Sequence, residues 1–307
     1  SYANVNGSNS ITIDVSKRIG ENIINTIDEV KKVASKTKKT FPENVEISFG
    51  NNLWHSEDDF DVALPIFGES GILLIDKPAE WTSFDVVNCV RARFNIPKVG
   101  HCGTLDPAAT GLLVLVLGRF TKMSQRFSGE DKVYEATILL GTETDSQDLD
   151  GEITAQNDFS NVTEEQFKEV VSEFIGEQLQ VPPMVSAVKK DGKRLYELAR
   201  KGVEVEREPK SINIESIEIT RFAPPEADFT VKCSKGTYVR TLCADMGEKL
   251  GCGACLKSLR RTSSGLFEIA DAVTIDTIKT WEQDDLQNHV KAFLIDKIIK
   301  NKLFTDF

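Results

Sequence analysis

Apolar residues in the middle of the chain follow two periodicities, one typical of buried strands and the other of amphipathic helices. Short apolar runs bounded by turn residues predict strands at residues 72–75, 112–117, 133–140 and 228–234. Apolar residues spaced at i, i+3 and i+4 predict helices that begin near Ser83, Thr163 and Val239. Because strands and helices interleave without a regular β-α-β alternation, we expect an α+β fold, with a mixed sheet and helices outside it.

Local signals predict the ends of two of these helices. Ser83 is expected to cap the first helix, because its hydroxyl can accept a hydrogen bond from a free backbone N–H. Thr163 and Gln166 have the spacing of a capping box at the start of the second helix. The apolar stripe that follows extends to Ile175, and Gly176 is expected to end that helix.

Composition divides the chain into three segments. Residues 1–70 form an acidic N-terminal extension that we expect to be partly disordered, with one amphipathic helix over residues 19–33. Residues 71–270 contain the predicted strands and helices and are expected to form the folded domain. Residues 271–307 are expected to be a short C-terminal tail.

The net charge of the chain is −11, from 37 Lys and Arg against 48 Asp and Glu. Non-specific binding of nucleic acid depends on neutralising phosphates, so this balance argues against indiscriminate binding to polyanions. Basic residues nevertheless cluster, with few acidic neighbours, within residues 91–98, 189–201 and 257–261. These clusters indicate a defined groove for a polyanion, although solvated surface segments would give the same pattern.

Membrane and metal chemistry have little support in the sequence. No run of about 18 apolar residues is present, so no membrane-spanning helix is expected. The six cysteines are too few for a disulfide scaffold, and the pair Cys252 and Cys255 lacks the second pair that a structural zinc site needs. We therefore expect free thiols, no metal and a reducing compartment. That compartment is the cytoplasm, or a plastid or mitochondrial matrix if an N-terminal targeting segment has been removed.

A loop in the middle segment presents a single carboxylate. The segment GHCGTLDP, residues 100–107, surrounds Asp106 with two glycines and a proline and leads into the strand at residues 112–117. An isolated carboxylate beside a sheet can be a nucleophile, a general base or a metal ligand, or it can simply cap the loop. The residue types alone leave these alternatives open.

A second segment, SKGTYVRT at residues 234–241, ends a strand with a glycine turn and begins a helix with Tyr238 and Arg240. Arg240 can hold a carboxylate through two parallel hydrogen bonds, and a buried carboxylate needs such a partner to stay ionised. Tyr134, on the strand at residues 133–140, offers an aromatic face on which a nucleobase could stack. Packing in the core is the alternative for both tyrosines.

Six segments, taken in their order along the chain, resemble the TruB family of tRNA pseudouridine synthases. They read GILLIDKPAEWTSFDVV, VGHCGTLDPAATGLLVLVLGRFTK, KVYEATILLGTETDSQDLDG, VPPMVSAVKKDGKRLYELARKG, CSKGTYVRTLCADMGEKLG and LRRTSSG. The resemblance extends from Gly71 to about Phe267. It implies the pseudouridine synthase fold, with a mainly antiparallel central sheet flanked by helices and a thumb-like insertion that binds RNA.

The resemblance also implies roles for individual residues. The catalytic positions fall on Asp106, on Arg240 that pairs with it, and on Tyr134 that stacks against the target uracil. The implied substrate-binding residues are His101, Lys77, Tyr238, Leu259, and Lys189 and Arg194 in the insertion. Two positions depart from the family pattern, Cys102 in the catalytic loop and Val185, where a tyrosine is common.

The activity implied by the resemblance is the isomerisation of uridine 55, in the T-loop of tRNA, to pseudouridine. The enzyme is expected to flip out the target nucleotide and to work as a monomer without cofactor, metal or obligate protein partner. One alternative is a chaperone that refolds the tRNA elbow, with catalysis secondary. Another is a guide-RNA-dependent enzyme that modifies ribosomal RNA. Bacterial members often end in a PUA domain, and residues 271–307 are too few and too acidic for a full one.

Overall fold

The computed structural model describes residues 2–5, 8–11, 70–186, 189–190, 193–195, 203 and 205–293. The chain forms two compact units, one of Ser1–Ile66 with Lys291–Phe307 and the other of Phe67–Val290. In the first unit β1 (Tyr2–Val5) and β2 (Ser8–Ile11) pair as an antiparallel hairpin. The amphipathic helix predicted over residues 19–33 lies outside the described residues. No helix in the described ranges is long and apolar enough to cross a membrane.

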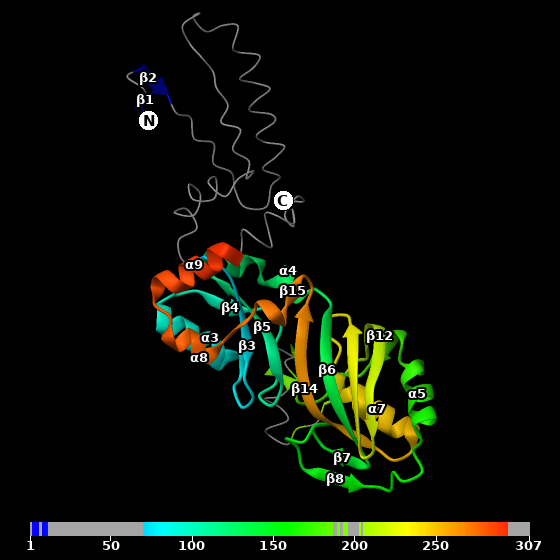
Figure 1. Cartoon of the computed structure of the whole chain (residues 1–307). Helices are drawn as coiled ribbons and strands as arrows, with labels where there is room; N and C mark the ends of the chain where they lie inside the picture. Colours follow the sequence, from blue (N-terminus) through cyan, green and yellow to red (C-terminus); the bar gives the residue numbers. More distant parts are fainter. Residues whose placement is uncertain are drawn as a thin grey trace, which may run out of the picture. The chain divides into compact units, whose positions relative to one another are not determined.

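A ten-stranded mixed sheet forms the centre of the second unit (Figure 1). Its strands are β3 (Gly71–Lys77), β4 (Val99–His101), β5 (Thr110–Leu117), β6 (Lys132–Leu140), β9 (Gly176–Gln180), β12 (Lys210–Ala223), β13 (Glu226–Cys233), β14 (Ala254–Ser264), β15 (Phe267–Glu268) and β16 (Val273–Thr274). The main path runs β16-β3-β5-β14-β6-β13-β12-β9, with β4 beside β5 and β15 beside β14. The parallel pairs in this path are β5–β14 and β3–β16. The predicted α+β fold with a mainly antiparallel sheet is confirmed.

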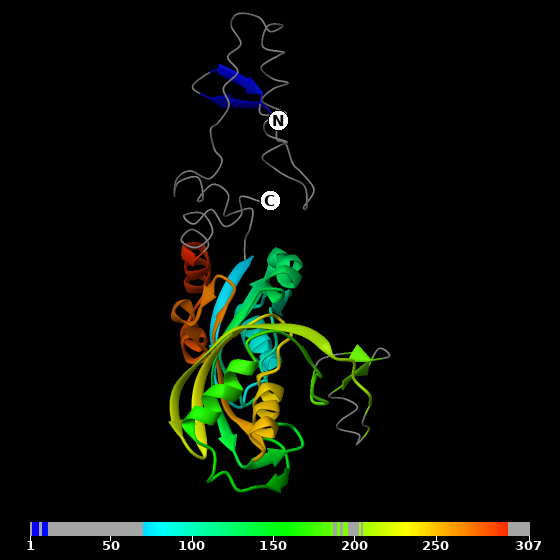
Figure 2. The same cartoon turned by 90° about the vertical axis from the view of Figure 1, so that its right-hand side faces the viewer.

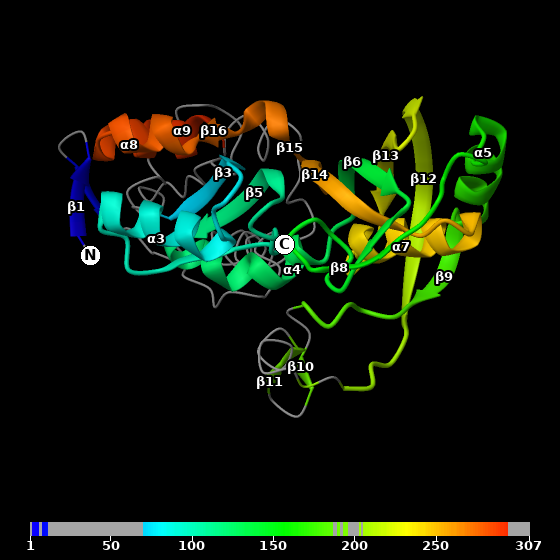
Figure 3. The same ribbon diagram turned by 90° about the horizontal axis from the view of Figure 1, so that it is seen from below.

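Helices pack on both halves of this sheet (Figure 3). α3 (Ser83–Phe94) contacts β4 and α8 (Ile275–Thr280), and α8 also contacts β3. α5 (Glu164–Glu173) and α7 (Val239–Leu250) bury Phe167, Leu242 and Met246 in one apolar cluster with Ile138 of β6 and Phe229 of β13. The remaining helices are α4 (Ser124–Ser128), α9 (Gln283–Phe293) and the short 3₁₀ helices η2 (Gly118–Met123) and η3 (Ile269–Asp271).

Two small hairpins stand outside the main sheet. β7 (Thr142–Thr144) and β8 (Ile153–Gln156) are joined by residues 145–152. β10 (Lys189–Lys190) and β11 (Lys193–Arg194) lie in the long connection between β9 and β12, at the position expected for the insertion. Figure 2 shows this second hairpin projecting from the side of the main sheet.

The four predicted strands are present, with ends that differ by one or two residues, but two details of the helix ends are wrong. Thr82, not Ser83, caps α3, because its hydroxyl accepts from the amide of Asp85 in a capping box. α5 ends at Glu173, and the chain then turns at Gly176 into β9, which leaves Ile175 49% exposed. The capping box of Thr163 and Gln166 is confirmed.

The domain boundary expected at residue 270 is also wrong. β16 pairs with β3 and so forms the edge of the main sheet. The α8 helix that follows buries Ile275 and Ile278. Because an edge strand is held by backbone hydrogen bonds, its two residues carry little hydrophobic pattern from which a sequence could predict it. The sheet domain therefore extends past residue 270.

A short parallel contact between β5 and β14 joins the two halves of the sheet. Thr110 pairs with Arg260, and Gly111 pairs with Arg261. Gly111 has a φ of +97°, and a Cβ atom added there would lie 2.3 Å from the carbonyl oxygen of Arg261. The strand that leaves the catalytic loop can approach β14 this closely only because residue 111 has no side chain.

We expect Gly111→Ala to lower the free energy of unfolding by about 2–4 kcal/mol, because positive φ and a backbone clash are each costly. Urea denaturation followed by circular dichroism measures the change. Gly100→Ala is the matched control: its Cβ would lie 3.6 Å from Val116 Cγ2, an ordinary contact. The close approach of β5 to β14 would be refuted if the two variants were equally stable.

Candidate active site

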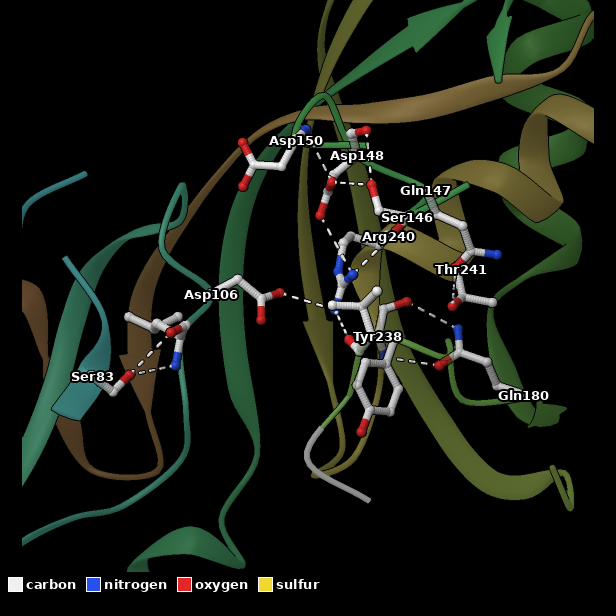
Figure 4. A network of polar contacts seen from close by, with 12 residues as sticks. Ser83, Asp106, Ser146, Gln147, Asp148, Asp150, Gln180, Tyr238, Arg240 and Thr241 are labelled. Carbon is white, nitrogen blue, oxygen red and sulfur yellow. Dashed lines mark hydrogen bonds and ion pairs between the residues drawn. The ribbon is translucent and has the colours of Figure 1, made fainter. Parts of the chain in front are cut away.

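The loop that carries Asp106 connects β4 to β5 and contains no regular secondary structure. Three carbonyl groups on alternate residues of this loop, those of Gly103, Leu105 and Pro107, accept hydrogen bonds from buried side chains of other elements. Asp106 itself points toward Arg240 at the start of α7 (Figure 4). The loop is therefore held from one side while its carboxylate is presented on the other.

Two of the anchors are the side chains of Arg261 and Ser83, which are 1% and 2% exposed. Arg261 donates to the carbonyl of Gly103 at 3.1 Å and to that of Leu112 at 2.7 Å, which ties the loop to β5. The Ser83 hydroxyl donates to the carbonyl of Leu105 at 3.1 Å and accepts from its amide at 2.9 Å. Buried backbone groups that lie outside any strand are thereby satisfied by side chains.

The third anchor is Lys77, whose side chain is fully buried. Its ammonium donates to the carbonyls of Pro107 at 3.1 Å, Pro78 at 2.9 Å and Trp81 at 2.6 Å. Burial lowers the pKa of Lys77 to about 8, and the negative charge of Asp106 acts in the opposite direction. This geometry does not support the predicted role of Lys77 in substrate binding. An ammonium with no exposed surface and three carbonyl partners positions the loop instead.

The guanidinium of Arg240 lies at the centre of the site and contacts groups from several segments (Figure 4). Its side chain is 4% exposed, and one terminal nitrogen lies 3.1 Å from Asp106 Oδ2 while the other lies 3.4 Å from Asp148 Oδ2. The same two nitrogens donate to the carbonyls of Val185 at 2.7 Å and Ser146 at 3.1 Å. The pairing with Asp106 predicted from the sequence is present. The bidentate geometry is wrong, because the second nitrogen is directed to another carboxylate.

Opposing effects act on the protonation of Asp106, whose side chain is 45% exposed. Partial burial raises the pKa of Asp106 above its ordinary value, Arg240 lowers it, and Asp148 and Asp150 raise it again. Lys77 adds a smaller lowering effect. The net effect is a pKa of Asp106 above its ordinary value, and the charge of Arg240 opposes part of the effect of desolvation and of the two neighbouring carboxylates.

Asp148 also faces Arg240, and the sequence analysis did not predict it as a site residue. Its carboxylate accepts from the hydroxyl of Ser146 and from the amide of Asp150, at 3.1 Å in the second case. An isolated bridge to Leu256 fixes its backbone on β14. The signal that could have found it is the dense acidic run TDSQDLD after a predicted strand. Only the fold shows which of its three aspartates faces Arg240.

The aromatic residues predicted for the site lie beside it. Tyr134 is half-buried on β6, opposite Arg261 of β14, and its pKa is raised by burial and also by the charge of Asp106. Tyr238 precedes α7, and its backbone amide and carbonyl are both bonded to the side chain of Gln180, at 2.8 and 3.1 Å. Both phenols are therefore neutral at pH 7, when they can stack or donate a hydrogen bond.

The other predicted residues are spread over several elements. Leu259 lies on β14 and packs against the apolar cluster under α7. His101 is half-buried at the end of β4, opposite Leu115. Lys189 and Arg194 are cross-strand partners in the β10–β11 hairpin. The structure thus brings Arg240, Tyr134 and Tyr238 within electrostatic range of Asp106, and the substrate contacts of all these residues stay predictions.

Known proteins are similar to this chain in sequence and fold. The sequence profile of the TruB family pseudouridylate synthase N-terminal domain matches residues 91–239, and that of the tRNA pseudouridylate synthase B C-terminal domain matches residues 240–300. A tRNA pseudouridine synthase B from Opitutus terrae is 49% identical over 220 residues, which cover 72% of this chain and 91% of the relative. The chain belongs to the TruB family.

Other TruB proteins and solved structures agree with this. The tRNA pseudouridine synthase B of Syntrophotalea carbinolica is 48% identical over 216 residues, 70% of this chain and 71% of that protein. A chain in the crystal structure of a Cbf5-Nop10-Gar1 complex superposes with a TM-score of 0.59 at 28% identity, over 81% of this chain and 65% of that one. The TruB segment matched by the two profiles extends past residue 270, in agreement with the position of β16.

We expect Asp148→Asn to slow pseudouridine formation by roughly tenfold or more, because Arg240 loses a charged partner. Asp148 raises the pKa of Asp106, so its removal should lower that pKa and move the acid limb of the rate profile to lower pH. Single-turnover rates over a range of pH measure both effects. Asp150 is exposed and raises the same pKa, so Asp150→Asn should shift the limb without reducing the plateau rate. A wild-type plateau and limb in Asp148→Asn would contradict this assignment.

Proposed function

We propose that this chain isomerises uridine 55 in the T-loop of tRNA to pseudouridine. The observation that carries the proposal is the buried guanidinium of Arg240, placed between Asp106 and Asp148 in a member of the TruB family. Curated relatives at 48–49% identity bear the name tRNA pseudouridine synthase B, which supports tRNA as the substrate. The half-exposed Asp106 can meet a nucleotide, and its buried anchors keep it in place.

The reaction rearranges one nucleotide without a change in composition. The C1′–N1 bond breaks and N1 keeps its electron pair, the uracil turns, and C1′ bonds to C5. C5 then loses its proton while N1 gains one, so no oxidant, reductant or group donor is needed. In this proposal Asp106 either attacks the ribose to form a covalent adduct or removes a ribose proton to give a glycal.

The remaining residues prepare the nucleotide for this step. A uridine stacked inside the T-loop has to leave the stack, which costs a few kcal/mol. Stacking on Tyr134 would offset about 1–3 kcal/mol of that. His101 would fill the space that the flipped nucleotide leaves, Tyr238 and Leu259 would line the pocket, and Lys189 and Arg194 would contact phosphates from the insertion. Arg240 lowers the pKa of Asp106 against the effect of burial and so favours the ionised form that attack would need.

A stand-alone monomer in the cytoplasm, or in an organelle matrix, completes the proposal. The Cbf5 chain that this chain resembles was crystallised with Nop10 and Gar1. Its identity to this chain is 28%, against 49% for a tRNA pseudouridine synthase B, which favours action without protein partners here. Pseudouridine formation by the purified chain on a tRNA transcript, without added protein or guide RNA, tests this point directly.

We expect Asp106→Asn to fold and to bind tRNA but to form no pseudouridine, because an amide cannot attack the ribose or accept its proton. Chemical mapping of pseudouridine in an unmodified tRNA transcript measures the product, and filter binding measures the affinity. Turnover like that of the wild type would refute the assignment. If the inactive variant still accelerated tRNA refolding as well as wild type, the chaperone alternative would be favoured over catalysis as the main function.

We expect Arg240→Lys to reduce the rate by roughly a hundredfold, because a single ammonium cannot face two carboxylates and two carbonyls at once. Single-turnover kinetics on the tRNA transcript measure this. Arg221 offers a matched control, since on β12 it pairs with two carboxylates of β13, Asp228 at 2.6 Å and Glu226 at 3.1 Å. Arg221→Lys should react like wild type. A rate for Arg240→Lys within about threefold of wild type would make the pairing argument wrong.

A further inference from the structure

The loop between β7 and β8 contains a backbone conformation that its residue type disfavours. Gln147 has a φ of +66°, in the left-handed region that glycine, asparagine and aspartate enter far more readily than glutamine. In the described ranges two other non-glycine residues, Glu80 and Asn95, also have a positive φ. Asn95 ends α3, where such a conformation is common, whereas Gln147 lies between two residues that contact Arg240. A strained residue at such a position indicates a functional constraint.

Gln147 is held in this conformation by contacts on three sides. Its side-chain oxygen accepts from the hydroxyl of Thr241 at 2.8 Å, and its carbonyl accepts from the amide of Leu256 at 3.0 Å. Its own amide donates to the carbonyl of Thr144 at 3.2 Å, which closes the turn. Thr241 is 4% exposed and follows Arg240 directly in α7. The strain is therefore balanced by α7, which also carries the guanidinium.

The neighbours of Gln147 explain what this conformation achieves. The carbonyl of Ser146 accepts from one nitrogen of Arg240 at 3.1 Å, and the carboxylate of Asp148 lies 3.4 Å from the same nitrogen. The left-handed backbone at residue 147 therefore lies between two groups that are both directed at one guanidinium. Figure 4 shows Gln147 and Thr241 on the side of Arg240 that is turned away from Asp106.

We propose that Gln147 and Thr241 are positioning residues: their hydrogen bond keeps Ser146 and Asp148 in place, and these hold the guanidinium of Arg240 opposite Asp106. The inference rests on the proposed function for its kinetic consequence alone, since the geometry of the loop is independent of the substrate. The contact between α7 and the β7–β8 loop thus acts through Arg240, and neither Gln147 nor Thr241 has to touch the nucleotide.

The test compares Thr241→Val with Thr241→Ser. Valine keeps the shape of threonine but lacks the hydroxyl, whereas serine keeps the hydroxyl and lacks the methyl group. The backbone bond to Leu256 remains in both variants, so the loop stays docked and both proteins should fold. We expect Thr241→Val to lower kcat about three- to tenfold with an unchanged KM for tRNA, and Thr241→Ser to match wild type.

A second readout does not depend on activity. The ¹³Cγ resonance of Asp106, assigned with Asp106→Asn, reports its pKa, on which Arg240, Asp148, Asp150 and Lys77 act. A guanidinium that moves away from Asp106 lowers that pKa less, so the midpoint should rise in Thr241→Val and stay constant in Thr241→Ser. Gln147→Ala should repeat the effect of Thr241→Val, and the double variant should be no worse than either single one.

The outcomes separate the inference from the proposed function. An unchanged midpoint and kcat in Thr241→Val would overturn the inference, as would an equal loss in Thr241→Ser, which would point to packing of the methyl group. If the wild-type chain formed no pseudouridine but the midpoint still rose in Thr241→Val, the positioning role would stand and the proposed function would fall. If wild type were active and the midpoint rose while kcat fell, both would be supported.

Discussion

The buried positive charge of Arg240 is the constraint on which the site depends. Removing a guanidinium from water costs several kcal/mol unless charged and polar partners replace the solvent. Here the partners come from three parts of the chain: the loop of Asp106, the β7–β8 loop and the start of the insertion. These segments have to meet at one point for the charge to be stable. The same arrangement places Arg240 opposite Asp106.

The loop of Asp106 is also held by buried cations, but these bind backbone carbonyls and not carboxylates. Lys77 and Arg261 are the buried cations, and both donate hydrogen bonds to backbone carbonyls of the loop and its neighbours. A loop outside regular structure has carbonyl groups that need donors, and long cationic side chains supply several at once. The carboxylate of Asp106 is therefore fixed through its backbone neighbours, and it stays 45% exposed while one of its oxygens pairs with Arg240.

The sheet connects these two arrangements. β14 places Arg261 under the catalytic loop and Leu256 under the β7–β8 loop, and its short parallel contact with β5 requires a glycine at residue 111. β6 presents Tyr134 beside the same strand. A change in the register of β14 would therefore move Arg261 and Leu256 away from the two loops that they hold and Arg261 away from Tyr134, because side chains alternate between faces along a strand.

The sequence by itself determined four strands and three helices of the sheet domain, the fold class and the central pair. Apolar runs located four strands because burial on both faces leaves a continuous apolar pattern, and the resemblance predicted the pairing of Asp106 with Arg240. Only the tertiary structure decided the role of Asp148, the inward position of Lys77, the edge strand after residue 270 and the left-handed Gln147. Each of these depends on a partner between 30 and about 200 residues away in the chain. Local patterns record which face of an element is buried, but they do not record which distant charge or carbonyl will meet it.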